Sequence, residues 1–97
     1  MNKTMDKTLE IIKPCTTNIG FENRVISRRI IALLNPSSAP IKRIIKIARE
    51  ENKLVDATSG KPTRSVIVTD SGHVFLSSIT PRKIKGRMEK GRNEEVS

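Results

Sequence analysis

The stretch from Ser38 to Lys53 constrains the fold more than any other, because it has the clearest periodicity in the chain. At about 100° of rotation per helical residue, four of its apolar side chains fall on one face of a helix. They are Ile41, Ile44, Ile45 and Ala48. Ser37 or Ser38 can accept hydrogen bonds from the first turn, where Pro40 is tolerated because no amide donor is needed. We therefore expect an amphipathic helix whose apolar face packs on a sheet.

The same stretch is strongly basic. Its basic side chains lie outside the apolar face, and all except Arg43 stack into one stripe. They are Lys42, Arg43, Lys46, Arg49 and Lys53. From Arg24 to Arg49 the chain has seven basic residues and no acidic one, within a net charge of +9. Such a run indicates a polyanionic partner, of which nucleic acid is the commonest and an anionic membrane the second.

The composition limits the core and the chemistry. The chain has 97 residues, no Trp or Tyr, and only two Phe, so one small core must come from Ile, Val and Leu. Such a core is too small for a deep substrate cleft, and oligomer assembly would support it. His73 and Cys15 are the only residues of their kinds and do not make up a metal site or a nucleophile with its base. The segment 59–63 lacks the upstream Gly of a phosphate loop. We therefore expect that the protein is not an enzyme and that it binds no metal, cofactor or small-molecule substrate.

The sequence also bears on location. A single cysteine forms no intrachain disulfide, which is usual in a reducing cytoplasm. The longest apolar run, Ile30–Leu34, is too short to span a bilayer, and the N-terminus lacks the apolar segment of a secretory signal. We expect a cytoplasmic, nucleoid-associated protein with no membrane partner.

One segment is ambiguous. The apolar residues of Arg24–Leu34 fit either a strand or a helix turn, and the β-branched residues and the stop at Asn35 and Pro36 favour a strand. On such a strand, Arg28 and Arg29 point to opposite faces. The other predicted strands are Thr16–Phe21, Leu54–Thr58, Arg64–Thr69 and His73–Ile79.

A turn and a helix complete the predicted elements. A tight hairpin is predicted at Asp70–Gly72, with Gly72 at positive φ. A final helix is predicted from Thr80 and Pro81, with Ile84 and Met88 as its apolar pair.

These elements follow the order strand, strand, helix, strand, strand, strand, helix. That order is typical of a single small α+β domain, a mostly antiparallel sheet with one central amphipathic helix and a C-terminal helix. We expect the domain to span residues 16–90, after a flexible extension at 1–15 and before a disordered tail at 91–97.

Binding to nucleic acid is better supported than catalysis. Arg and Lys neutralise phosphates, and Arg also reads guanine edges with two hydrogen bonds. Aromatic side chains for stacking single-stranded RNA are scarce, so duplex DNA is the favoured partner. The candidate contacts are Arg24, Arg28 and Arg29, then Lys61 and Arg64, with supporting charge from Lys42, Arg43, Lys46 and Arg49 and from the basic tail Arg82, Lys83, Lys85, Arg87, Lys90 and Arg92.

Four segments resemble the RemA proteins, small bacterial DNA-binding regulators that activate extracellular matrix genes. They contain P-x-S-A-P-I-K-R, D-A-T-x-G and T-R-x-V-I-V-x-D in this order and spacing. The segments are NIGFEN (18–23), RRIIALLNPSSAPIKRIIKIARE (28–50), LVDATSGKPTR (54–64) and SVIVTDSGHVFLSSITP (65–81).

The resemblance implies a compact α+β protomer that closes into a ring-shaped homo-oligomer, an octamer, and binds DNA along a basic outer surface. It also implies DNA contacts at Arg29 and at the loop that ends with Arg64. The family's loop has two adjacent arginines after the Gly, where this chain has Lys61 and Pro62. Because Lys lacks the guanidinium fork and Pro has no charge, affinity or specificity is expected to differ.

The sequence thus predicts a sequence-selective DNA-binding regulator of transcription, resembling the activators of extracellular matrix (biofilm) genes. A nucleoid or architectural DNA-binding protein without a defined target is the alternative, and an RNA-binding protein is a remote one.

Overall fold

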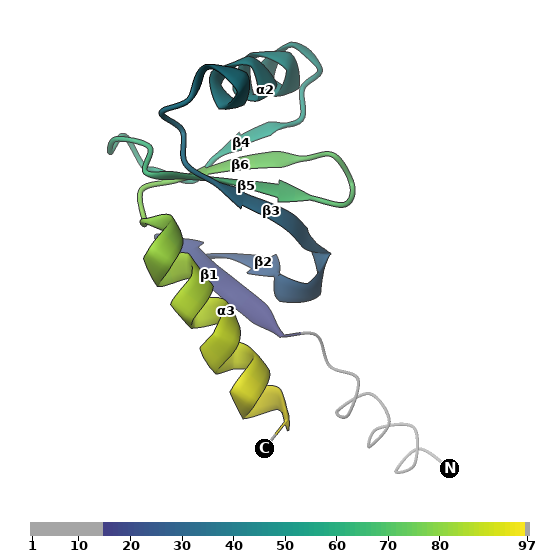
Figure 1. The fold of residues 1–97 in the computed structure, drawn as a ribbon, viewed down its shortest axis with the longest axis vertical. Coiled ribbons are helices and arrows are strands. Elements are labelled where there is room, and N and C mark those ends of the chain that lie inside the picture. The colour runs from purple at the N-terminus through teal and green to yellow at the C-terminus, as the bar shows by residue number, and fades with distance from the viewer. Residues whose placement is uncertain (1–14, 97) are drawn as a thin grey trace.

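The computed structural model describes the backbone of residues 15–96 and the side chains of residues 15–89. Its elements confirm an α+β domain with a central and a C-terminal helix (Figure 1). In chain order they are β1 (Thr16–Gly20), β2 (Asn23–Ile26), the 3-10 turn η1 (Ser27–Arg29), β3 (Ile30–Leu34), α2 (Ala39–Glu50), β4 (Leu54–Asp56), β5 (Ser65–Thr69), β6 (Val74–Ser77) and α3 (Pro81–Val96).

The predicted domain bounds stay predictions. The extension at 1–15 lies outside the described residues apart from Cys15. The backbone of α3 continues to Val96, through most of the segment expected to be a disordered tail.

The strands form two sheets. Hairpin β1–β2 is a small antiparallel sheet of its own, and the main sheet has the order β3-β5-β6-β4. The pairs β3–β5 and β5–β6 are antiparallel, whereas β4 lies parallel to β6. The prediction of a mostly antiparallel arrangement is confirmed.

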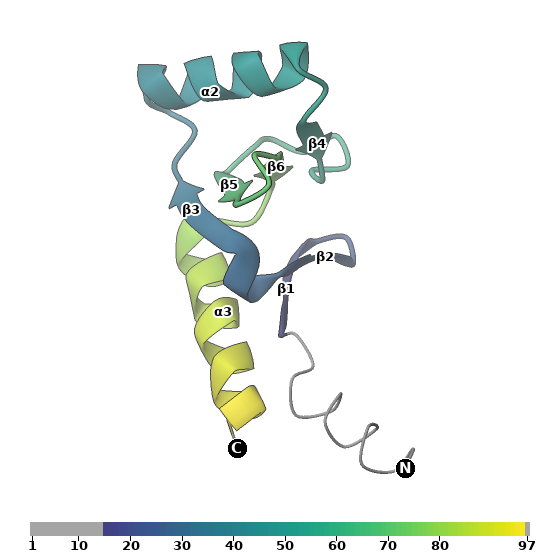
Figure 2. The same ribbon diagram turned by 90° about the vertical axis from the view of Figure 1, so that its right-hand side faces the viewer.

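The main sheet lies between two layers. Figures 1 and 2 show α2 on one side of it, and hairpin β1–β2 with α3 on the other. On the α2 side, Val66 packs with Ala48; on the opposite side, Ile67 packs with Ile19 and Ile84. Because side chains alternate along a strand, the consecutive residues Val66 and Ile67 are both fully buried, one in each cluster. Strand β5 is therefore the centre of the fold.

The predicted strand Arg24–Leu34 is wrong as a single element. Strand β2 ends at Ile26 because it pairs with β1, while β3 begins at Ile30 because it pairs with β5 in the other sheet. The turn η1 carries the chain from one sheet to the other. Arg28 and Arg29 therefore lie on this turn, where both are exposed, and do not alternate across a strand.

Helix α2 buries its apolar face only in part. Ala48 is buried and Ile45 is half-buried, but Ile44 keeps 37% of its surface exposed. Ser38 occupies the N-cap, yet its side chain makes no capping bond, so that prediction is wrong. The side chain of Asn35 accepts the Ser37 amide instead, at 2.9 Å, in the connection before the helix. Pro40 does lie in the first turn.

The predicted hairpin and final helix are confirmed. Strands β5 and β6 are joined by the Asp70–Gly72 turn, with Gly72 at a φ of 85°. The Thr80 hydroxyl accepts the Lys83 amide at 3.4 Å at the start of α3. Ile84 of α3 is fully buried, and Met88 packs against the same core cluster.

Candidate nucleic-acid interface

The two strongest predicted contacts, Arg29 and Arg64, lie at opposite ends of the main sheet. Arg64 directly precedes β5, and Asp70, which binds Arg29, directly follows it. At about 3.4 Å per residue in a strand, the positions 64 and 70 are roughly 20 Å apart. One chain therefore presents two separate basic sites, which we call the Arg29 end and the Lys61–Arg64 end.

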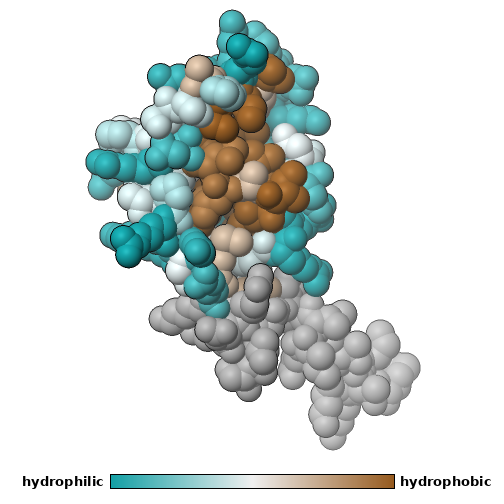
Figure 3. Space-filling model, in the orientation of Figure 1, coloured by the Kyte–Doolittle hydropathy of each residue, from teal (hydrophilic) through white to brown (hydrophobic). Residues whose placement is uncertain are grey.

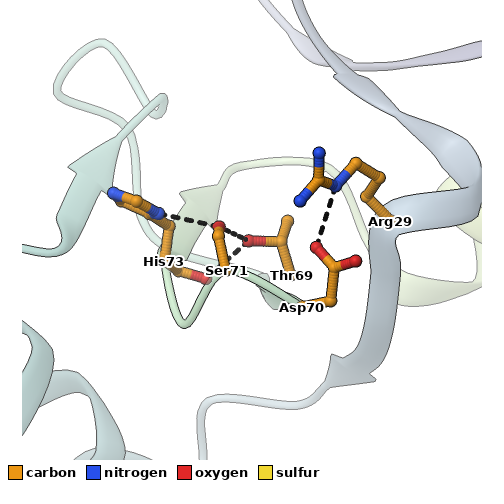
Figure 4. A network of polar contacts seen from close by, with 5 residues as sticks. All are labelled: Arg29, Thr69, Asp70, Ser71 and His73. Atoms are coloured by element: carbon orange, nitrogen blue, oxygen red, sulfur yellow. Dashed lines mark hydrogen bonds and ion pairs between the residues drawn. The ribbon is translucent and has the colours of Figure 1, made fainter.

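At the Arg29 end, the guanidinium is held by an acidic partner. Its Nε donates a hydrogen bond to Oδ1 of Asp70 at 2.9 Å, and the side chains are 53% and 49% exposed (Figure 4). The Asp70 amide also donates to the Arg29 carbonyl at 2.9 Å. Two bonds thus join η1 to the β5–β6 turn.

The turn that carries Asp70 is itself cross-linked. Thr69 Oγ1 and Ser71 Oγ are 2.9 Å apart, and Ser71 Oγ lies 2.8 Å from Nδ1 of His73 (Figure 4). The Gly72 amide donates to the Thr69 carbonyl at 3.0 Å. Because these bonds restrain the turn, the Asp70 carboxylate has a defined place beside Arg29.

The Lys61–Arg64 end is built from two loops. Lys61 Nζ lies 5.6 Å from the ring centroid of Phe21, a cation–π contact that joins the β4–β5 loop to the β1–β2 turn. Phe21 is 49% exposed and has a φ of 52°, a left-handed conformation that is rare for a bulky residue. The Arg64 amide donates to the Ser77 carbonyl at 2.7 Å, which holds the end of the loop against β6.

Asp56 anchors the start of the same loop. Its Oδ1 accepts the Thr58 hydroxyl at 2.6 Å and the Thr58 amide at 2.9 Å. These two bonds, the hydroxyl bond first, lower the pKa of Asp56 below its ordinary value of 3.8, with help from the Arg49 charge and against the effect of burial. The loop is thus fixed at both ends, and Lys61 and Arg64 project from a restrained backbone.

The remaining predicted contacts are exposed but dispersed. Arg24 donates from Nη1 to Thr16 Oγ1 at 3.3 Å within the β1–β2 hairpin, and Arg87 donates from Nη1 to the Asn18 carbonyl at 3.0 Å. Lys90 and Arg92 lie beyond the described side chains. The supporting basic residues of α2 are all exposed. They lie on the side of the main sheet opposite hairpin β1–β2 and α3, and they are Lys42, Arg43, Lys46 and Arg49.

Apolar side chains are also exposed. Ile31 of β3 is 66% exposed, and Val55 of β4 and Ile47 of α2 are exposed too. Strands β3 and β4 are the two edges of the main sheet. Figure 3 shows a continuous apolar area over the sheet and α2, with hydrophilic residues at its margins. An apolar area of this kind is typical of a surface that another protein covers.

Among the side chains of residues 15–89, no cluster of three or more His, Cys, Asp or Glu is placed to hold a metal. No helix within residues 15–96 is both long and apolar enough to cross a bilayer.

Comparison with known proteins decides the family. Residues 17–88 match the RemA-like family, described as extracellular matrix regulatory protein A-like. The chain therefore belongs to the RemA-like family. Among similar proteins, each named "Putative regulatory protein", one from Dictyoglomus thermophilum is 52% identical over 82% of this chain and 94% of its own length. One from Oceanobacillus iheyensis is 55% identical over 82% and 91%, and one from a Synechococcus strain is 60% identical over 72% and 79%. The family description and the names of these relatives both indicate a regulatory protein.

Sequence reasoning missed two residues of this RemA-like chain. Asp70 was expected only as a turn residue, and Phe21 only as a rare aromatic. The Arg29–Asp70 contact spans 41 positions, so it follows from the pairing of β3 with β5. Phe21 does have a local signal, because it follows Gly20 at the tip of a predicted strand.

Proposed function

We propose that this RemA-like protein is a sequence-selective DNA-binding regulator of transcription that acts in the cytoplasm, on the nucleoid, as a ring-shaped homo-oligomer. The observation that carries the proposal is the pair of exposed basic sites, each on a restrained turn, at the two ends of one sheet. Exposed guanidinium and ammonium groups on rigid supports suit the fixed spacing of DNA phosphates and guanine edges.

Duplex DNA is the partner that this chemistry favours. The net charge of +9 provides for phosphate contacts and counterion release. Of the two Phe residues only Phe21 is exposed, so the stacking platforms typical of single-strand binders are largely missing from residues 15–96.

Assembly is supported by the exposed apolar residues. Ile31 and Val55 lie on opposite edge strands, so two copies can meet edge to edge in a head-to-tail contact. Repeated head-to-tail contacts close a ring when the rotation permits. Strands β3 and β4 run in the same direction, so such a contact sets the Arg29 ends of successive copies side by side, and likewise their Lys61–Arg64 ends, which makes repeated basic surfaces.

A ring raises the overall affinity for DNA even when each single contact is weak. Once one protomer is bound, the contacts of the others become intramolecular, and the overall affinity exceeds that of a single patch. This effect offsets the loss of two loop arginines at Lys61 and Pro62. The family description, extracellular matrix regulatory protein A-like, supports genes of the extracellular matrix as the regulated genes.

Binding and footprinting on promoter DNA test the proposal. The logarithm of the association constant is expected to fall linearly with the logarithm of salt concentration, because phosphate contacts release counterions. Protection is expected at discrete sites. Uniform protection along any duplex would instead indicate an architectural DNA-binding protein. If single-stranded RNA competed more strongly than duplex DNA, RNA would be the partner.

A further inference from the structure

The Arg29–Asp70 pair is placed by the fold and not by the two side chains alone. Ile30 and Thr69 are register partners at the end of the β3–β5 ladder, and Arg29 and Asp70 are the next residues along. Their backbones are joined by the bond from the Asp70 amide to the Arg29 carbonyl. The carboxylate therefore stands opposite the guanidinium before any ligand arrives.

The bond uses only one nitrogen of the guanidinium. Nε donates to Asp70, and neither terminal nitrogen donates to a described residue. Figure 4 shows the carboxylate on the Nε side of the group. The Nη1–Nη2 edge therefore remains available, and it can make two parallel bonds to the O6 and N7 atoms of guanine.

Asp70 has two opposite effects on DNA at this place. Its negative charge repels phosphates, which weakens binding to every sequence. Its bond to Nε also removes rotational freedom from a long side chain, so less entropy is lost when that side chain contacts a base. The charge of Asp70 by itself only weakens phosphate binding at this surface, whereas its bond to Nε gives it a role in orienting Arg29.

We propose that Asp70 is a positioning residue that holds Arg29 for bidentate contact with a guanine. The inference rests on the proposed function, since it needs DNA as the ligand. Asp70 itself touches no DNA in this role. It acts through the orientation of Arg29. It lowers the affinity for every DNA sequence and raises the preference for sequences that contain the guanine.

The test compares two duplexes. One is enriched by the wild-type protein from a random duplex pool, and the other is poly(dA-dT), which contains no guanine. In Asp70→Ala, the ratio of the two affinities is expected to fall about tenfold, the size of one bidentate base contact. Affinity for poly(dA-dT) is expected to rise, because a repulsive charge is gone. Asp70→Asn keeps an oxygen that can accept from Nε, and most of the ratio is expected to remain.

Two controls separate positioning from charge and from folding. Glu51→Gln removes the same charge from an exposed position, and it is expected to raise both affinities equally. In an Arg29→Ala background, Asp70→Ala is expected to leave the ratio unchanged, because there is no side chain to position. Melting and sizing of Asp70→Asn and Asp70→Ala establish that fold and assembly are kept.

The failures are distinguishable. If the wild type binds no duplex or enriches no sequence, the proposed function fails. If it enriches a sequence but Asp70→Ala leaves the ratio unchanged, whether both affinities rise together or neither moves, Asp70 does not position Arg29. A ratio that falls equally in the Arg29→Ala background would also overturn the inference.

Discussion

At the scale of single residues, the group that each basic side chain contacts distinguishes it more than its charge does. Arg29 and Lys61 are both exposed cations, but one is held by a carboxylate and the other lies over an aromatic ring. Exposed ion pairs add about 0–1 kcal/mol to stability, so the Arg29–Asp70 pair has little effect on folding. Its value lies in where it holds the guanidinium.

Arg29→Ala is therefore expected to separate binding from stability. The free energy of unfolding should change by less than about 1 kcal/mol, while affinity for promoter DNA should fall at least about tenfold because a bidentate contact is lost. Calorimetric melting and gel-shift titration measure the two quantities. Arg43→Ala removes the same charge from α2 and should weaken binding much less; equal losses would mean that only net charge counts.

Asp56→Ala is expected to give a pH-dependent loss of stability. The pKa of Asp56 is lower in the folded protein than its ordinary value of 3.8, so its bonds to Thr58 stabilise the fold above that pH. This contribution is lost as the pH falls through the lowered pKa. At pH 7 the free energy of unfolding of the variant should be lower than that of the wild type by up to about 1 kcal/mol, because the carboxylate is exposed. Thermal melting at a series of pH values should show this difference shrinking as the pH falls below 3.8 and through the lowered pKa. A difference that keeps the same size across the series would contradict this account.

At the scale of elements, the two helices are attached differently. Helix α3 inserts the fully buried Ile84 between the main sheet and β1, whereas α2 leaves Ile44 and Ile47 exposed over the opposite side. The attachment of α3 is complete within one chain. The attachment of α2 leaves apolar surface exposed, which the proposed assembly would cover.

Ile84→Ala is expected to lower the free energy of unfolding by about 2–5 kcal/mol, because the substitution leaves a cavity in the cluster that joins β1, β5 and α3. Urea unfolding followed by circular dichroism measures the change. Lys85→Ala, at the next and exposed position of α3, should change it by less than about 0.5 kcal/mol. Similar effects from the two variants would show that α3 is not docked through Ile84.

At the scale of the whole molecule, both edges of the main sheet are open within residues 15–96, and apolar side chains stand on them. Edge strands that carry exposed apolar residues tend to pair with another chain. A small core of aliphatic residues also gains from such a contact.

Ile31→Glu is expected to abolish assembly, because it puts a charge into the proposed contact between copies. Light scattering on a sizing column should report a monomer, with promoter affinity reduced by the loss of multivalency. Lys42→Glu, an exposed change on the polar side of α2, is the matched control and should leave the mass unchanged. An assembly that survives Ile31→Glu would place the contact elsewhere.

What the sequence determined by itself is local. The period of α2, the Asp70–Gly72 turn and the pairing of Ile84 with Met88 follow from neighbouring residues, and the family followed from motifs of a few residues each. Only the tertiary structure decided that the chain changes sheets at η1, that β4 lies parallel to β6, and that Arg29 meets Asp70. The reason is physical: strand partners are chosen by burial of both faces of β5, a sum over residues far apart in the sequence, which no local period records.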